Sequence, residues 1–246
     1  MVEGGSALAV LGNHELNALA FHTPSPVRPG AFLRLRTVKN LRQHQQTLDQ
    51  IPAADFAKYL DWFRTLPMWL ELPGLRVVHA CWNGAAIQEI EQALIRYSGL
   101  SDAFLTEAYT DQTPLFRALE IVLRGPEAEL PSGISYFDKD GHERHKMRIR
   151  WFLPPVEHTY RTYGLQADEI ACDLPIAAEL ITATQSYPAD AKPVFIGHYW
   201  LQAEHPALLT SNVACLDYSV AKGGFLTAYR WDGETELSDS KFVFCK

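Results

Sequence analysis

Three segments of the sequence end a short apolar run with a side chain that can hold a metal ion. Ala-Val-Leu-Gly is followed by Asn13 and His14, Arg-Val-Val by His79, and Val-Phe-Ile-Gly by His198. Imidazole nitrogens bind borderline metals, and an amide oxygen suits Mn, Mg or Fe. Residues just beyond the carboxyl ends of strands in an α/β sheet converge on one crevice. The pattern predicts that Asn13, His79 and His198 share one divalent ion, with His14 available for acid–base chemistry.

Each of these residues also has a purely structural explanation. A single His at a strand end is more often a polar side chain that its own neighbours satisfy than a ligand. Three such strand ends in one chain favour the shared site. The remaining histidines lack this context and are expected at the surface or in structural roles; they are His22, His44, His142, His145, His158 and His205.

A short basic segment, residues 145–152, could supply a phosphate-binding group. Together with Arg144, its side chains Arg148 and Arg150 are either a solvated basic edge or reach the crevice and bind a phosphate. Both interpretations stay open on the sequence. In the second, Arg148 and Arg150 are the substrate-binding residues.

The elements that must position these residues show a strand–turn rhythm at both ends of the chain. Apolar runs predict strands over 7–11, 69–72, 75–79, 192–200, 212–217, 225–231 and 241–245. A helix is expected to begin near His14, with Asn13 at its cap. Residues 37–50 are expected to form a surface helix or loop.

A second helix is predicted over 53–66, because its apolar residues recur at helical spacing. These are Phe56, Tyr59, Leu60 and Phe63. Residues 85–190 lack the strand–turn rhythm, although 87–97 and 114–124 read as helices. We therefore interpret 85–190 as a mixed α+β cap or insertion within a single domain that spans 1–246.

Composition narrows the class of protein. The chain has 246 residues, of which 47% are hydrophobic and 21% charged, as in folded globular domains. A net charge of −7 makes a nucleic-acid polymer a poor candidate partner. The four cysteines form no C-x-x-C pair, which favours reduced thiols in the cytoplasm. No apolar run approaches the roughly 20 residues of a membrane span, so no membrane partner is expected.

Four motifs, in order along the chain, resemble those of the calcineurin-like metallophosphoesterases. They are L-G-N-H-E (11–15), V-V-H-A (77–80), F-I-G-H-Y-W (195–200) and C-L-D-Y-S-V-A-K-G-G-F-L-T-A-Y-R (215–230). The chain is most similar to the branch that holds the Ser/Thr phosphoprotein phosphatases and the symmetrical diadenosine tetraphosphatases. The resemblance implies an α/β fold, the family's four-layer α/β/β/α sandwich. The middle third of the chain has no matching motif.

The resemblance also implies a metal-dependent phosphoesterase. Asn13, His79 and His198 resemble the protein ligands of the second metal, and His14 resembles the His that protonates the leaving oxygen. The implied cofactors are two divalent ions, with Mn expected first and Fe or Zn as alternatives; a bridging hydroxide attacks phosphorus in line. The implied substrates are phosphoproteins, dinucleoside polyphosphates or small phosphate esters. Trp200 stands where other branches have a second His, which agrees with this branch.

Two motifs that open the family, G-D-x-H-G and G-D-x-x-D-R-G, are not in this sequence. In the family they supply the first metal's Asp and His, the bridging Asp, an Asp that orients the catalytic His and an Arg for the phosphate. Met1 therefore resembles an internal methionine, and the chain resembles a family protein truncated at its N-terminus. Without a carboxylate, the ligands that remain hold a divalent ion less tightly. The alternative is an inactive family fragment or pseudoenzyme that acts as a binding module, and a hydrolase with one metal is less favoured.

Overall fold

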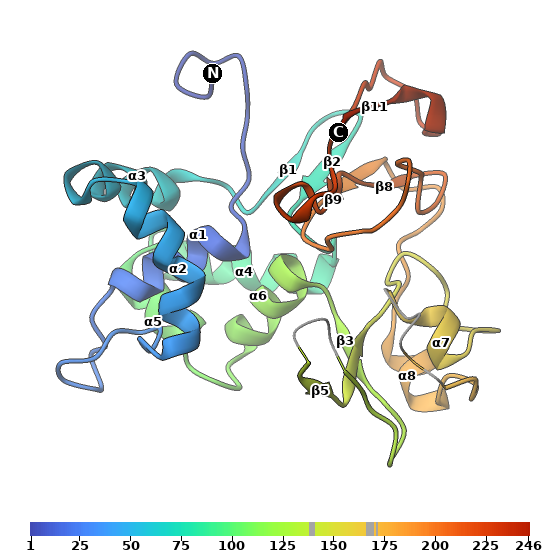
Figure 1. Cartoon of the computed structure of the whole chain (residues 1–246), viewed down its shortest axis with the longest axis horizontal. Helices are drawn as coiled ribbons and strands as arrows, with labels where there is room; N and C mark the ends of the chain where they lie inside the picture. The colour runs from blue at the N-terminus through green and yellow to red at the C-terminus, as the bar shows by residue number, and fades with distance from the viewer. Residues whose placement is uncertain (138–140, 166–169, 171) are drawn as a thin grey trace. The chain divides into compact units, whose positions relative to one another are not determined.

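The computed structural model describes residues 1–137, 141–165, 170 and 172–246, and the fold is mixed α/β (Figure 1). The chain divides into two compact units. Unit 1 comprises Met1–Leu70 and Asn83–Leu123, and unit 2 comprises Glu71–Trp82 and Arg124–Lys246. One boundary between the units, at Leu123–Arg124, falls inside the predicted insertion of 85–190, and the single-domain interpretation stays a prediction. Within the described ranges, no helix combines the length and the apolar character that a membrane crossing requires.

Unit 1 is built mainly from helices. They are α1 (Asn13–His22), α2 (Val38–Gln50), α3 (Ala53–Thr65), α4 (Gly84–Arg96), α5 (Asp102–Ala108) and α6 (Pro114–Arg124). The predicted helices over 53–66, 87–97 and 114–124 are confirmed, and 37–50 is a helix rather than a loop. Not all of the predicted apolar face of α3 is buried, because Phe56 lies in the core whereas Tyr59 is exposed.

The predicted strand over 7–11 is wrong. These residues pair with no strand in the described part of the chain, and the backbone hydrogen bond that anchors them runs from Leu11 N–H to the Pro67 carbonyl at 2.8 Å. Leu11 is fully buried, whereas Leu8 is exposed. An apolar run favours burial, but a β-strand also requires a neighbouring strand with which to form backbone hydrogen bonds. Residues 7–11 have no such neighbour in the described part of the chain.

Helix α1 begins one residue earlier than the sequence predicts. Gly12 is the cap, and Asn13 is the first helical residue. The Glu15 carboxylate accepts the Gly12 N–H at 2.9 Å, so the third helical residue reaches back to satisfy the donor at the helix start. The prediction of Asn13 as the cap is therefore wrong, because Glu15 rather than an Asn side chain satisfies the backbone there.

A pair of histidines joins α2 to α1. His44, the buried residue of α2, has its Nε2 atom 3.2 Å from Nε2 of His22. The rings of Phe21 and Phe56 pack against both imidazoles. Burial lowers the pKa of His44 to about 4, with smaller contributions from the nearby charges of His22, Arg34, Arg36 and His14. Burial also lowers the pKa of His22. Both rings are therefore neutral at pH 7 and joined by one hydrogen bond.

Unit 1 should lose stability in acid through this pair. The pKa of His44 is about 4 in the folded chain and 6.5 in the unfolded chain, so its contribution is complete above pH 6.5 and falls as the pH drops towards 4. The expected loss is at most about 3 kcal/mol of unfolding free energy. Urea unfolding at several pH values measures it.

A matched pair of variants isolates the contribution of His44. His44→Gln should flatten the acid slope, because Gln does not titrate, whereas His145→Gln alters an exposed ring and should leave the slope unchanged. An equal slope in the parent and in His44→Gln would contradict the assignment.

Unit 2 contains all the described strands except β1 (Trp69–Glu71), most of which belongs to unit 1. The larger sheet has the order β1-β2-β7-β8, with β2 (Arg76–Val78), β7 (Val194–Ile196) and β8 (Val213–Cys215). β2 pairs with β7, and β7 with β8, both in parallel. The predictions of strands β2, β7 and β8 are confirmed, and so is the predicted hairpin from β1 to β2. A hydrogen bond from the Leu72 N–H to the Leu75 carbonyl closes the turn of this hairpin.

A second, antiparallel sheet follows near the C-terminus, in the order β11-β10-β9. Its strands are β9 (Asp217–Tyr218), β10 (Phe225–Tyr229) and β11 (Phe242–Cys245). The strands predicted over 225–231 and 241–245 are thereby confirmed. The intervening residues form short elements: β3 (Glu127–Glu129), β4 (Tyr136–Phe137), β5 (Glu143–Arg144), β6 (Lys146–Arg148), α7 (Tyr160–Tyr163) and α8 (Ala178–Ala183). Phe195, Ala214 and Leu237 form a buried cluster in this unit, against which Trp231 and Phe242 pack.

Candidate functional site

Two of the predicted metal ligands lie side by side in unit 2. His79 follows β2 by one residue and His198 follows β7 by two, and the parallel pairing of these strands brings both to the same edge of the sheet. Nε2 of His79 lies 3.2 Å from Nδ1 of His198, and the ring centroids are 5.1 Å apart. The structure thus brings together two residues that are 119 positions apart in the sequence.

The spacing of the two imidazoles fits a shared metal ion. Two nitrogens bound to one tetrahedral ion, each at the usual distance, lie about 3.3 Å apart. The observed 3.2 Å also suits a hydrogen bond between neutral rings. No group of three His, Cys, Asp or Glu side chains that could hold a metal occurs in the part of the chain that is described. A metal at this pair therefore needs a further ligand of another type, such as an amide oxygen or water.

The turn that carries His198 has an unusual backbone. His198 has φ of 71° and Trp200 has φ of 53°, in the left-handed region that side chains other than Gly seldom adopt. Gly197 N–H donates to the His79 carbonyl at 2.9 Å, so the turn is fixed to the residue that carries the other imidazole. Two such residues within three positions are a strained arrangement, which persists only where neighbouring contacts enforce it.

Asp217 enforces this turn. One of its carboxylate oxygens accepts the Trp200 N–H at 3.2 Å, and the other accepts the Ser219 N–H, also at 3.2 Å. Its backbone carbonyl accepts the Leu201 N–H at 2.9 Å. Asp217 follows β8 and thus reaches the same sheet edge as the two histidines. Both oxygens bind backbone amides, so we assign Asp217 the role of holding the His198 turn.

Tyr199 joins the two His-bearing segments. Its buried hydroxyl donates to the Ala80 carbonyl at 2.9 Å, next to His79, and accepts a hydrogen bond from Trp151 Nε1 at 3.0 Å. Burial raises the pKa of the phenol well above its usual range, so the hydroxyl stays a donor. Gly125, with φ of 80°, leaves room for it, since a Cβ there would lie against the Tyr199 hydroxyl.

The positioning roles of Asp217 and Tyr199 do not follow from the sequence alone. The available signal was their place in two motifs, G-H-Y-W and C-L-D-Y, each directly after an apolar strand. Neither motif indicates which side chain binds backbone and which faces a ligand. That distinction depends on the direction of the turn.

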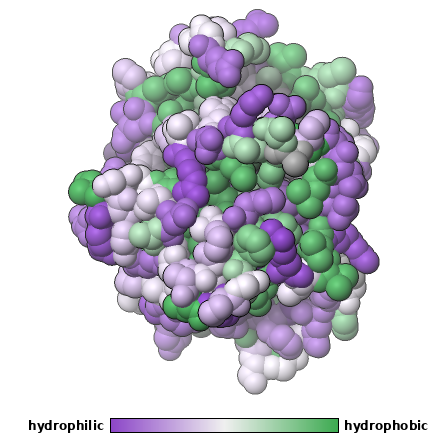
Figure 2. Space-filling model, turned by 90° about the vertical axis from the view of Figure 1, so that its left-hand side faces the viewer, coloured by the Kyte–Doolittle hydropathy of each residue, from purple (hydrophilic) through white to green (hydrophobic). Residues whose placement is uncertain are grey.

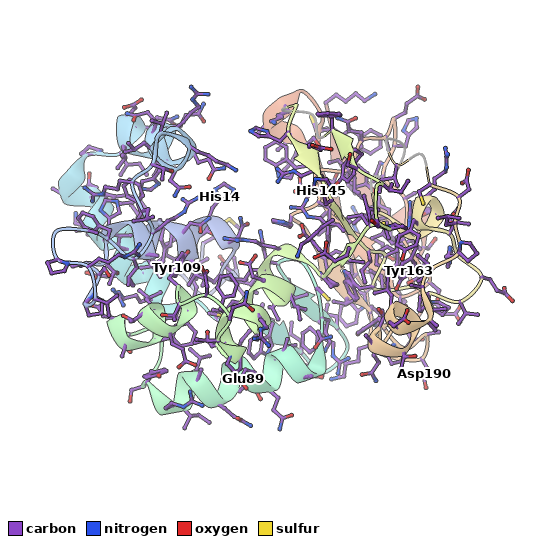
Figure 3. The ribbon with its side chains drawn as sticks, turned by 90° about the horizontal axis from the view of Figure 1, so that it is seen from below. His14, Glu89, Tyr109, His145, Tyr163 and Asp190 are labelled. Atoms are coloured by element: carbon purple, nitrogen blue, oxygen red, sulfur yellow. The ribbon has the colours of Figure 1, made fainter. Side chains whose placement is uncertain are left out.

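Asn13 and His14 belong to unit 1, where they are the first two residues of α1. Asn13 is half-buried and His14 is exposed; Figure 3 labels His14 beside this helix. The N-terminus of a helix carries partial positive charge, which favours negatively charged groups close to it. The start of α1 therefore has a positive local potential.

The two predicted phosphate-binding arginines have different environments in unit 2. Arg148 ends β6 opposite Glu127 of β3. Burial raises the pKa of the Tyr199 phenol, and the positive charge of Arg148 partly opposes this rise. Arg150 directs its Nε–H to the Gly164 carbonyl at 3.2 Å, and its backbone N–H to the Tyr163 carbonyl. The role of both arginines in binding substrate stays a prediction.

Comparison with known proteins gives no match: no family model, no curated protein and no solved structure matches this chain. The resemblance to metallophosphoesterases therefore rests on the four motifs. The geometry described above is an independent observation, because it follows from the strand pairing rather than from the motifs.

Asp217→Asn should weaken the His198 turn without changing its shape. One amide of the turn keeps its oxygen acceptor, whereas the other faces an NH₂ group, so about 1–2 kcal/mol of unfolding free energy should be lost. Affinity for Zn²⁺ should fall as well, because the two imidazoles are held less firmly. Thermal unfolding and titration calorimetry measure the two effects.

Asp190→Asn is the matched control, since Asp190 is an exposed carboxylate of the same unit, labelled in Figure 3. It should change neither stability nor Zn²⁺ affinity. Parent-like values for Asp217→Asn would show that its two backbone contacts do not hold the turn.

Proposed function

We propose that this chain is a metal-dependent phosphoesterase of the calcineurin-like type, which hydrolyses phosphate monoesters or pyrophosphate esters. The observation that carries the proposal is the His79–His198 pair at the carboxyl ends of two adjacent parallel strands. The spacing of the pair fits one divalent ion. The four sequence motifs support the same assignment.

The proposal gives each residue a distinct task. His79 and His198 hold the ion, and Asn13 adds an amide oxygen, an assignment that rests on the G-N-H-E motif. His14 donates a proton to the leaving oxygen, as a general acid at the start of a helix does. Bound divalent ions, of which Mn²⁺ is the first expectation and Fe or Zn the alternatives, supply charge that offsets the phosphate and lower the pKa of water.

The arrangement of the sheets supports the finer fold assignment within this proposal. A four-layer sandwich needs two β-sheets, and the chain has a mainly parallel sheet of β1, β2, β7 and β8 as well as an antiparallel sheet of β9, β10 and β11. The chain passes from β8 to β9 with one residue, Leu216, between them. This direct connection brings Asp217, the first residue of the second sheet, next to the His198 turn.

Hydrolysis of p-nitrophenyl phosphate with and without Mn²⁺ tests the proposal. Turnover should require Mn²⁺, stop on chelation, and fall by about a hundredfold or more in His198→Ala, because the ion loses one of its two imidazole ligands. Calorimetry with Mn²⁺ on the same variant tests binding apart from catalysis.

His145→Ala serves as the control for this experiment, because it removes an exposed imidazole of unit 2 that the proposal does not use. It should leave both Mn²⁺ affinity and turnover unchanged. Turnover that persists after chelation, or in folded His198→Ala, would overturn the proposal.

His14→Asn separates proton donation from metal binding. The variant should keep the Mn²⁺ affinity of the parent, while turnover falls by about a hundredfold or more for lack of the general acid. The loss should be smaller for p-nitrophenyl phosphate than for an alkyl phosphate, because p-nitrophenolate leaves without a proton. Equal losses for the two substrates would contradict the role of His14.

An inactive binding module is the second candidate, and one observation favours it. Both carboxylate oxygens of Asp217, the acidic residue at this sheet edge, accept backbone amides and thus serve the fold. A site of two imidazoles and one amide is neutral and offsets none of the ion's charge. Metal binding without turnover, from a folded chain, would select this candidate.

A further inference from the structure

Residues 27–42 of unit 1 alternate aliphatic and cationic side chains. Four times in this segment an exposed aliphatic residue directly precedes a cationic one, in the pairs Val27-Arg28, Leu35-Arg36, Val38-Lys39 and Leu41-Arg42. No Asp or Glu lies between Leu16 and Leu48, although the whole chain carries a net charge of −7. Such a stretch creates a local positive potential on an otherwise acidic protein.

The aliphatic members of these pairs face solvent. Val27 is 77% exposed and Val38 is 76% exposed, and Leu35 and Leu41 are exposed to a lesser degree. Figure 2 views the molecule from the side on which α2 and α3 lie in Figure 1, and hydrophobic and hydrophilic side chains are interspersed on this face. We call residues 27–42 the mixed basic segment.

The cationic side chains of this segment are held to different degrees. The Arg36 guanidinium lies 3.5 Å from the Phe32 ring centroid and 4.8 Å from that of Phe21. Lys39 and Arg42, both exposed, have no hydrogen-bond or ion-pair partner among the residues that the structure describes. Arg28 and Arg34 also donate hydrogen bonds, to the Leu33 carbonyl and to Gln43. Of the five cations of the segment, three are therefore held, and Lys39 and Arg42 are available to a ligand.

The pattern disfavours two classes of anionic partner. A single-stranded nucleic acid stacks its bases on exposed aromatic rings, whereas Phe32 is covered by Arg36. A helix that lies on a membrane separates its apolar face from its cationic face. On α2, Leu41 and Leu48 lie on the same side of the helix as His44, which is buried, so the protein covers part of this side although both leucines are exposed. The segment thus offers aliphatic groups and cations side by side.

We propose that the mixed basic segment binds an acidic peptide segment of a partner protein, one in which carboxylates alternate with aliphatic side chains. The carboxylates pair with Lys39 and Arg42, while the aliphatic side chains cover Val27 and Val38. Opposite charges steer the two chains together, and the apolar contacts add affinity that salt does not screen. This inference does not depend on the proposed phosphoesterase activity.

Fluorescence anisotropy with labelled synthetic peptides tests the proposal. The probe is a peptide of about twelve residues in which Glu alternates with Leu or Val. One reference peptide replaces the aliphatic residues by Ser, and a second replaces Glu by Gln. The parent chain should bind the probe at least about fivefold more tightly than either reference, because both kinds of contact contribute.

Variants at exposed positions keep the fold intact. Lys39→Glu/Arg42→Glu should weaken binding of the probe by about tenfold or more, and Val27→Ser/Val38→Ser by about threefold or more. Lys58→Glu and Ile95→Ser are matched controls, since they change an exposed cation and an exposed aliphatic residue elsewhere in unit 1. Both controls should bind as the parent does, and thermal unfolding checks that all variants fold.

Four outcomes would overturn the proposal. They are the absence of probe binding, parent-like binding by both double variants, tighter binding of oligo-dT or of phosphatidylserine vesicles than of the probe, and self-association of the chain that Lys39→Glu/Arg42→Glu abolishes. The third would assign the segment to a nucleic acid or a membrane surface, and the fourth to a second copy of this chain.

Discussion

The parallel pairing of β2, β7 and β8 is the constraint on which the candidate site depends. It brings His79, His198 and Asp217 to one sheet edge from three separate parts of the sequence. Parallel strands start and end together, so side chains just beyond their carboxyl ends meet without any further interaction. The contacts of Asp217 and Tyr199 then fix the turn geometry that strand pairing leaves open.

The same physical rule explains how much of the structure could be predicted. Apolar runs bounded by turn residues identified β2, β7, β8, β10 and β11, because burial on a sheet requires such runs. Ala7–Leu11 has the same composition and is not a strand, since pairing depends on a neighbour that composition does not specify. His79 and His198 could be placed together for the reason given above. The hydrogen bonds of Asp217 could not be predicted from the sequence, because they depend on the positive φ values at His198 and Trp200.

Unit 1 shows a different limit of sequence reasoning. His44 lies in a polar helix and was expected at the surface or in a structural role, and it is the buried contact of that helix. An isolated His among Gln residues carries no periodic signal, so its burial follows only from the tertiary contact with His22. The net charge of the chain likewise does not indicate the cationic residues of the mixed basic segment. A net charge is a sum over the whole surface, whereas each part of the surface attracts ligands through its own local charges.

The hydrogen bond from Trp151 to Tyr199 has an optical consequence. Indole emission depends on the partner of its N–H group, and here that partner is the side chain that spans the segments carrying His79 and His198. Any ligand that shifts these segments relative to each other changes the surroundings of Trp151. The chain has six tryptophans. The part of the indole emission that comes from Trp151 therefore reports on the contact between the two His-bearing segments.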